Sequence, residues 1–207
     1  MSSVQSVEAS AMPRCWSCRG PVDVRAAFCA TCGAVQPPAA ADPFDRLGFA
    51  HGYDIDPAAL DRGYFDLQRR LHPDRFASKG ARERTFSQQQ AAAINDAYQT
   101  LKDPLMRAVA LLRHAGRKID LDGQGTIADA ELLNEAMEMR EALAEAESSA
   151  QAEQLARRAD DDLAAGRHAL AQAFAAADFD AAERQVLRLR YLGKLAEEAR
   201  LRRRALV

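Results

Sequence analysis

The absence of proline from residues 128–207 constrains the fold of this chain more than any other feature. Proline breaks the interior of a helix, whereas alanine, leucine, glutamate and arginine, which dominate this stretch, favour helices. Two breaks, near Ser148-Ser149 and Ala177-Asp178, divide the stretch into three helices. We expect an up-down-up bundle within a C-terminal domain of residues 126–207. The expected helices are residues 128–147, 150–176 and 180–204.

The overall composition limits the possible functions. Of the 207 residues, 48% are hydrophobic and 28% are charged, so the chain can bury a core and is not disordered as a whole. The formal net charge of -2 argues against bulk electrostatic binding to nucleic acid or anionic lipid. No stretch approaches the roughly 18–20 apolar residues that span a bilayer, and the first residues lack the pattern of a secretory signal or an organellar presequence. We therefore expect a cytoplasmic protein with no nucleic-acid partner and no membrane partner.

All the cysteines fall in one short module, expected at residues 13–36 behind a disordered tail of residues 1–12. They form two CxxC pairs, made of Cys15, Cys18, Cys29 and Cys32. Each pair can form a tight turn that aims two thiolates at one point, and Gly20, Pro21 and Gly33 stand where tight turns need such residues. Two pairs together complete a tetrahedral four-sulfur site, which makes the module zinc-ribbon-like.

The chemistry of four thiolates narrows the role of the metal ion. Such a site leaves no open position for water, so we expect one structural metal ion rather than a catalytic one. Zinc is the first expectation, and iron is the alternative because it shares this ligand set. A pair of disulfide bonds is a further alternative, which a reducing cytoplasm disfavours.

The central segment predicts two helices joined by a short loop. Asp56-Pro57 opens the first helix, because aspartate caps a helix and proline fits its first position. Its apolar stripe is made of Leu60, Tyr64, Leu67 and Leu71. Pro73 forces this helix to end near Leu71, and a second helix is expected at about 81–101. The two helices have little to bury against except each other, so we expect an antiparallel hairpin.

Three pieces of this segment resemble the J domain, the co-chaperone module that stimulates ATP hydrolysis by DnaK-type chaperones. They are Phe44-x-x-Leu47-Gly48, His72-Pro73-Asp74 and Ala97-Tyr98-x-x-Leu101. The resemblance implies a J domain at residues 42–116. The chaperone-binding residues that it implies are Arg69, Arg70, His72, Pro73 and Asp74.

The residues of the loop are themselves consistent with docking. Pro73 fixes the backbone and lowers the entropy lost on binding. Arg62, Arg69 and Arg70 on the preceding helix can steer an acidic partner. One alternative is a simple helix stop with solvated His72 and Asp74. Another is an enzyme that uses His72 as a general base, but the segment shows no nucleophile motif, no glycine-rich phosphate loop and no second carboxylate cluster.

Apolar residues of the first bundle helix cover more than one face. At about 100° per residue, one set clusters within roughly 60° and suffices for a core stripe. This set is Leu132, Ala136, Met139 and Leu143. Leu133 and Met137 lie about 90–130° from the centre of that stripe, beside Glu138, Glu141 and Glu145. An apolar pair bordered by carboxylates predicts a docking surface, and a wider core is the alternative.

Three further stretches resemble one family of J proteins, the HscB co-chaperones of iron–sulfur cluster biogenesis. They are residues 104–108, 137–143 and 187–195, within a similarity that spans 42–200. The paired CxxC module resembles that of the eukaryotic-type members. In this family the C-terminal bundle binds the cluster scaffold IscU, and the J domain engages the chaperone HscA or its counterpart.

The resemblance also implies a scaffold-binding face. Its residues would be Leu133, Met137, Glu138, Arg140, Glu141, Glu145 and Tyr191. Asn134 and Ala128 depart from residues that the family can carry there, a larger apolar residue and a basic one respectively, and both departures could reshape the contact.

The sequence thus predicts an all-α protein with a small metal module, a J-domain hairpin and a three-helix bundle. Its expected function is that of a non-catalytic co-chaperone, which binds an iron–sulfur scaffold protein and delivers it to a DnaK/HscA-type ATPase. The alternative function is a general J protein that presents unfolded clients through its C-terminal helices.

Overall fold

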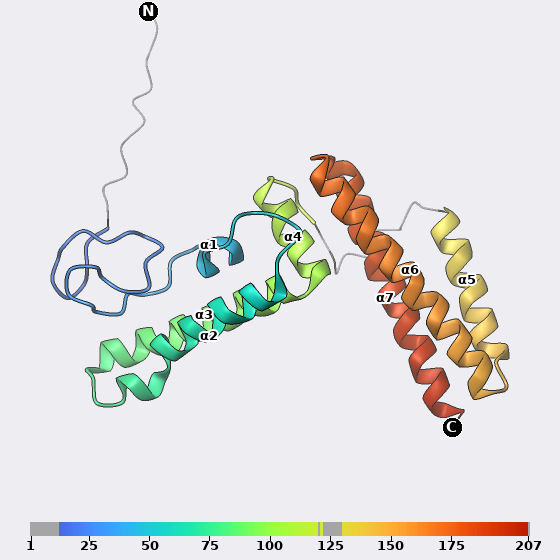
Figure 1. The fold of residues 1–207 in the computed structure, drawn as a ribbon, viewed down its shortest axis with the longest axis horizontal. Helices are drawn as coiled ribbons and strands as arrows, with labels where there is room; N and C mark the ends of the chain where they lie inside the picture. Colours follow the sequence, from blue (N-terminus) through green and yellow to red (C-terminus); the bar gives the residue numbers. More distant parts are fainter. Residues whose placement is uncertain (1–12, 120, 122–129, 207) are drawn as a thin grey trace, which may run out of the picture. The chain divides into compact units, whose positions relative to one another are not determined.

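The computed structural model describes residues 13–119, 121 and 130–206. The chain divides into two compact units: His51–Ile55 joins the part from Thr100 onward, and the remaining residues up to Gln99 form the other unit. Within the described ranges, regular secondary structure is helical (Figure 1). The cysteine module adds two isolated β-bridges. The all-α fold class expected from the sequence is confirmed. The expected tail of residues 1–12 lies outside the described residues.

The described helices follow the expected order along the chain. They are α1 (Pro43–Leu47), α2 (Pro57–Leu71), α3 (Ala81–Lys102), α4 (Pro104–His114), α5 (Ala130–Glu145), α6 (Ser149–Ala175) and α7 (Phe179–Ala205). The segment between α2 and α3, expected as a loop, contains a 3-10 turn at Pro73–Phe76. The sixth helix begins one residue before the expected position because Ser148 and Gln151 form a reciprocal capping box at its start.

Aspartate–proline pairs begin three of these helices. The Asp42 carboxylate accepts a hydrogen bond from the backbone N–H of Asp45 at 2.9 Å, which caps α1. Asp56 does the same for α2, and Asp103 for α4, and in each case proline occupies the first helical position. The cap satisfies a backbone donor that the helix leaves free, and proline loses nothing there because that N–H has no partner within the helix.

Two tyrosines form the seam between α2 and α3. The rings of Tyr64 and Tyr98 stack with centroids 4.0 Å apart. The Tyr64 hydroxyl donates to Asn95 Oδ1 at 2.7 Å, and the Tyr98 hydroxyl donates to Asp61 Oδ1 at 2.7 Å. Stacked rings with satisfied hydroxyls combine apolar burial and fixed geometry, so this seam sets the register of the hairpin.

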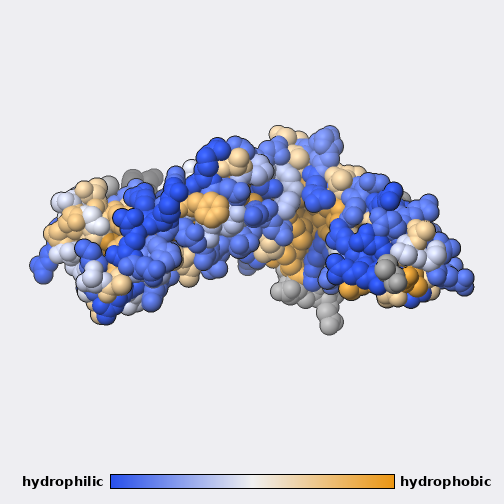
Figure 2. All heavy atoms as spheres, turned by 60° about the horizontal axis from the view of Figure 1, so that its bottom comes forward, coloured by the Kyte–Doolittle hydropathy of each residue, from blue (hydrophilic) through white to orange (hydrophobic). Residues whose placement is uncertain are grey.

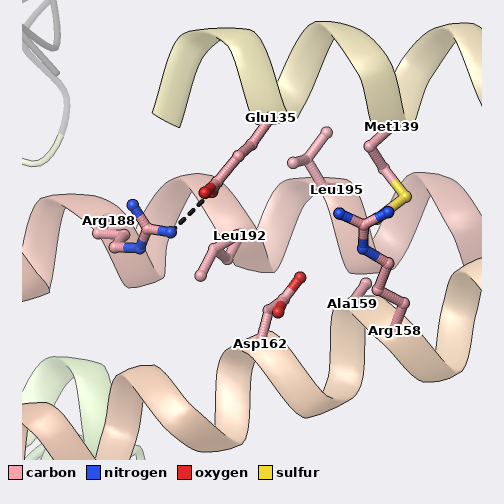
Figure 3. A pocket seen from close by; sticks show the side chains of 8 residues that line it. All are labelled: Glu135, Met139, Arg158, Ala159, Asp162, Arg188, Leu192 and Leu195. Atoms are coloured by element: carbon pink, nitrogen blue, oxygen red, sulfur yellow. Dashed lines mark hydrogen bonds and ion pairs between the residues drawn. The ribbon is translucent and has the colours of Figure 1, made fainter. Parts of the chain in front are cut away.

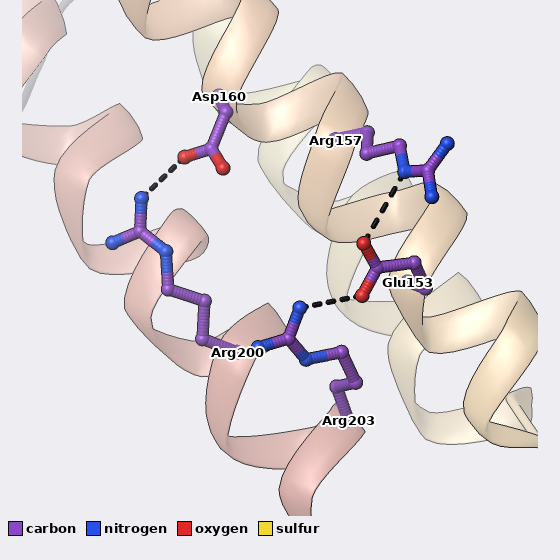
Figure 4. Close-up of polar contacts among 5 residues, drawn as sticks. All are labelled: Glu153, Arg157, Asp160, Arg200 and Arg203. Carbon is purple, nitrogen blue, oxygen red and sulfur yellow. Dashed lines mark hydrogen bonds and ion pairs between the residues drawn. The ribbon is translucent and has the colours of Figure 1, made fainter.

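Small residues let α6 and α7 pack closely along their length. Gly166 of α6 is buried, and a Cβ atom at this position would lie 2.7 Å from Leu189 Cδ2 of α7. Their shared surface is rich in alanine, which allows the helix axes to approach. Ion pairs border the contact: Arg200 with Asp160, and Arg203 with Glu153 (Figure 4).

The fifth helix rests on the α6–α7 pair through a thin apolar seam and several arginines. Ala136, Met139 and Leu143 are the buried apolar residues of this seam. Arg188 of α7 pairs with Glu135 of α5 at 2.7 Å, at the edge of a cleft of about 70 Å³ between the three helices (Figure 3). Polar side chains therefore help to hold α5 against α6 and α7.

Arg202 of α7 holds the C-terminal end of α5. Its guanidinium donates from Nε to the Leu143 carbonyl at 3.1 Å and from Nη2 to the Ala146 carbonyl at 2.8 Å. Carbonyls in the last turn of a helix have no partner within the helix, so a side-chain donor there replaces the missing backbone N–H groups.

We predict that Arg202→Ala destabilises the attachment of α5. Loss of charge-assisted hydrogen bonds to these carbonyls should cost about 1–2 kcal/mol. Thermal unfolding should show a lower melting temperature, and amide hydrogen exchange should speed up in the last turn of α5. Arg204→Ala, which removes an exposed arginine from the same turn, should change neither measurement. Equal effects of the two variants would contradict this role of Arg202.

Candidate metal centre and interaction surfaces

The four cysteine sulfurs lie close enough together to hold one metal ion. The distance from Cys15 Sγ to Cys32 Sγ is 3.7 Å, and that from Cys18 Sγ to Cys29 Sγ is also 3.7 Å. All four sulfurs lie within 4.8 Å of one another, and none of the cysteines is in a disulfide bond. A tetrahedral zinc site with bonds of about 2.3 Å requires sulfur–sulfur distances of about 3.8 Å. This geometry fits a four-thiolate site, and the four cysteines are free thiols in this structure.

Each CxxC pair is shaped by the same local turn. The N–H of Arg19 donates to the Cys15 carbonyl at 2.9 Å, and the N–H of Gly33 donates to the Cys29 carbonyl at 2.9 Å. Both donors adopt positive φ, 62° for Arg19 and 74° for Gly33. In the first pair the left-handed residue is therefore Arg19, and in the second it is a glycine.

The electrostatics of the thiols also favour a cation. Burial opposes ionisation of Cys15, but the backbone N–H groups of Cys18 and Ser17 outweigh it and lower the pKa of Cys15 to about 6. The Gly20 N–H favours the Cys18 thiolate, yet the neighbouring thiols, Cys32 first, raise the pKa of Cys18 to about 11. Ionisation of one thiol in the cluster is therefore favoured, whereas ionisation of all four is opposed by repulsion between the thiolates. A divalent cation would remove that repulsion.

A glutamine joins the cysteine cluster to the α2–α3 hairpin. The Gln36 amide donates from Nε2 to Cys15 Sγ at 3.4 Å, and the Gln36 backbone carbonyl accepts from Gln90 Nε2 of α3 at 3.0 Å. Beside this link, the Trp16 ring meets Phe86 edge-on at 5.9 Å. This contact between the module and α3 cannot be predicted from the sequence, because no local pattern pairs residues so far apart in the chain.

The His-Pro-Asp segment forms a rigid, exposed turn. Pro73 begins the 3-10 turn, and the Asp74 N–H donates to His72 Nδ1 at 3.3 Å. The Ser87 hydroxyl of α3 donates to the buried Leu71 carbonyl at 2.7 Å, which satisfies the end of α2. The side chains of His72 and Asp74 remain 52% and 89% exposed. The Asp74 carboxylate also lies 3.5 Å from His72 Nδ1, so both of these contacts are made at Nδ1.

The arginines of α2 have neighbours within their own unit. Arg69 pairs with Asp66, and Arg62 lies 3.6 Å from Asp56. The guanidinium of Arg70 lies over the Phe28 ring of the cysteine module, 4.9 Å from its centroid. The positive charges expected on α2 at Arg62 and Arg69 thus lie beside acidic side chains, and the Arg70 guanidinium faces the cysteine module. Its predicted role in chaperone binding stays a prediction.

The exposed face of α5 carries the predicted apolar pair. Met137 is 60% exposed and Leu133 is 37% exposed, whereas Met139 and Leu143 are only 7% and 6% exposed. The alternative of a wider core is therefore wrong for Leu133 and Met137. The side chain of Leu132, expected in the core stripe, lies outside the described residues, as does Ala128. In a space-filling view the surface is largely hydrophilic, with smaller apolar areas between (Figure 2).

The other predicted scaffold-binding residues divide into two groups. Glu138, Glu141 and Glu145 are exposed on α5, as is Asn134. Arg140 instead donates from Nη1 to the half-buried Tyr191 hydroxyl at 2.9 Å and from Nε to Glu198 at 3.1 Å. The hydrogen bond to Glu198 raises the pKa of Arg140 further.

Comparisons with known proteins agree with this arrangement. The HSCB C-terminal oligomerisation domain matches residues 128–200. The iron–sulfur cluster co-chaperone protein HscB of Mus musculus is 33% identical over 196 residues, which cover 93% of this chain and 83% of the mouse protein. A co-chaperone protein HscB homolog of Shewanella sp. (strain ANA-3) is 39% identical over 163 residues, 75% of this chain and 92% of that protein. The crystal structure of human co-chaperone protein HscB matches with a TM-score of 0.85 at 33% identity, covering 91% of this chain and 98% of that one.

The chain therefore belongs to the J-type co-chaperones and, among them, to the HscB family of iron–sulfur cluster assembly. The relatives are named as co-chaperones, in line with a role other than catalysis. None of the described helices is long and apolar enough to cross a membrane.

We predict that purified protein contains about one metal ion per chain, by elemental analysis. Removing it with a chelator should unfold the cysteine module while most of the helical circular-dichroism signal remains, because metal binding and folding are coupled in so small a unit. Replacing Cys18 and Cys32 together by serine should abolish metal binding, whereas Ser17→Ala should retain it. A metal-free module that stays folded would disprove the structural role.

Proposed function

We propose that this protein binds an IscU-type scaffold through α5, delivers it to a DnaK/HscA-type chaperone, and stimulates the chaperone's ATPase through the His-Pro-Asp turn. The membership in the HscB family supports the two kinds of partner. The cysteine module would hold zinc as a structural ion, with Cys15, Cys18, Cys29 and Cys32 as ligands.

The observation that carries the chaperone half of the proposal is the geometry of the turn. His72 caps a 3-10 turn that begins at Pro73 and contains Asp74, and both side chains are exposed. The Ser87 hydroxyl fixes the end of α2 just before this turn. A donor and an acceptor presented on a stiff backbone lose little conformational entropy when a partner binds them. ATP would be bound and hydrolysed by the partner.

The scaffold half of the proposal rests on the composition of the α5 surface. Leu133 and Met137 provide a small apolar centre, and three exposed glutamates border it. A small apolar core with a charged rim is typical of a specific contact with one folded partner. A general J protein that binds unfolded chains would instead need a broad apolar groove.

We predict that His72→Gln abolishes stimulation of the chaperone ATPase without unfolding the hairpin. The side chain is exposed, and such substitutions usually change stability by less than about 0.5 kcal/mol. Single-turnover ATP hydrolysis by the chaperone is the measurement, with circular dichroism as the check on folding. His168→Gln, on the exposed surface of α6, is the matched control. Full stimulation by a folded His72→Gln variant would exclude this role of the turn.

We predict that replacing Leu133 and Met137 together by serine weakens scaffold binding. Loss of two apolar anchors should cost about 2–4 kcal/mol, or roughly 30- to 1000-fold in Kd, measured by calorimetry. The melting temperature should barely change, because both side chains are exposed.

The matched control for this variant is Met139→Ser with Leu143→Ser. These residues face the bundle, so the control should lower the melting temperature. An unchanged scaffold affinity after the Leu133 and Met137 substitutions would reject α5 as the docking surface. Undiminished binding of an unfolded model client, together with absent scaffold binding by the unmodified protein, would favour the general J protein.

A further inference from the structure

Two histidines that lie far apart in the sequence meet in the compact unit that contains the bundle. His51 begins the segment His51–Ile55 of this unit, and His114 is the last residue of α4. Their imidazole rings stack with centroids 3.7 Å apart and planes inclined by 20°. Both residues are exposed, and a ring nitrogen of each lies within 4.8 Å of a ring nitrogen of the other. The pair is separate from the four cysteines, which belong to the other unit.

A buried tyrosine holds the segment in which His51 lies. The ring of Tyr53 stacks on that of Phe174 of α6, with centroids 5.4 Å apart, and Tyr53 is only 8% exposed. The Arg107 guanidinium of α4 lies over the same Tyr53 ring, 5.2 Å from its centroid. Arg107 and His114 stand at positions i and i+7 of α4, so they share one face of that helix. The segment therefore runs along this face, and its attachment at Tyr53 keeps His51 beside His114.

Two imidazole nitrogens at this separation can ligate one divalent transition-metal ion. Zinc binds histidine nitrogen at about 2.0–2.1 Å, so two such nitrogens on one tetrahedral ion lie about 3.4 Å apart. Because both side chains are exposed, small rotations of the rings reach this spacing without disturbing a packed core. His114 also ends a helix, where backbone carbonyls carry a partial negative charge that favours a cation. The neighbouring cation Arg113 projects about 100° away around the helix.

We propose that His51 and His114 form a metal site separate from the four cysteines, at which an imidazole nitrogen from each residue binds one divalent transition-metal ion such as zinc. Magnesium and calcium are not its ions, because they prefer oxygen ligands. Two protein ligands leave further positions on the ion to water, so this site binds its metal more weakly than four thiolates do. The site needs neither partner of the proposed function.

A metal ion at this site would clip the segment before α2 to the end of α4. The two ligands are far apart in the sequence, so the ion closes a long loop of the chain. Closing a long loop removes more entropy from the unfolded chain than closing a short one. An ion that binds only the folded form stabilises that form in proportion to the logarithm of its free concentration. The expected effect of the ion is therefore a more stable unit.

The test is zinc binding by the full-length protein, measured by equilibrium dialysis after the four cysteines have been saturated with zinc. The unmodified protein should bind about one further zinc ion per chain. His51→Phe and His114→Phe keep an aromatic ring for stacking but remove the ligand, and each should weaken this binding at least about tenfold. The double variant should bind little more weakly than either single variant, because both nitrogens hold the same ion. His168→Phe, on the exposed surface of α6, is the matched control and should bind zinc as the unmodified protein does.

Thermal unfolding supplies the second measurement. At a free zinc concentration about 100 times the Kd, the ratio of unfolded to folded protein should fall about 100-fold, and the melting temperature should rise accordingly. Magnesium at the same concentration should leave the melting temperature unchanged. His51→Phe and His114→Phe should unfold at the same temperature as the unmodified protein before zinc is added, and further zinc should not stabilise them.

Three results would overturn the inference. The first is an unmodified protein that binds no zinc beyond its cysteines, and the second is unchanged zinc affinity in either folded phenylalanine variant. The third is the binding of two further ions, one lost in each variant, because the histidines would then bind metal independently. If a phenylalanine variant loses helicity by circular dichroism, His51→Gln and His114→Gln take its place in the same comparison.

Discussion

The backbone restriction at Pro73 is the constraint on which the J-domain hairpin depends. A proline disfavours the helical conformation in the residue before it, and His72 accordingly adopts a ψ angle of 129°. The chain leaves α2 at that point, turns through a single 3-10 segment and returns as α3. The buried carbonyl that α2 leaves at Leu71 finds its donor in the Ser87 hydroxyl of the returning helix. The proline ring thus ends a helix, leaves two polar side chains exposed and turns the chain back toward α2, where the tyrosine seam sets the register of the hairpin.

The two surfaces proposed for partner binding lie on different compact units. One unit contains the His-Pro-Asp turn at the end of α2, and the other contains the apolar pair on α5. Each surface stands on a helix that is held from behind by side chains of its own unit: the tyrosine seam behind α2, and the arginines of α7 behind α5. Rigid support of this kind lowers the conformational entropy that an exposed side chain loses when a partner binds it.

Local rules were enough to predict most of the fold and part of the site. Aspartate–proline pairs, helical periodicity and the CxxC spacing act over a few residues, so they could be read directly, and the exposure of Leu133 and Met137 followed from the helical phase alone. The contacts that could not be predicted join residues far apart in sequence, such as Gln36 with Gln90 and Arg140 with Glu198. A long side chain has many rotamers, and its choice among distant acceptors is decided by the packed structure. The positive φ of Arg19 was missed for a different reason, since glycine is the usual residue in that conformation.

The Gln36 link couples the four-cysteine site to the stability of helix α3 outside the module. One end of this residue contacts a sulfur ligand, and the other accepts a hydrogen bond from α3. A ligand that binds only the folded form adds a free energy of stabilisation that grows with the logarithm of its free concentration. Because the module and the hairpin share one compact unit, that increment is felt by the helices that carry the turn. If the four cysteines hold a metal ion, its concentration in the surrounding solution would enter the unfolding equilibrium of the α2–α3 hairpin as well as that of the module.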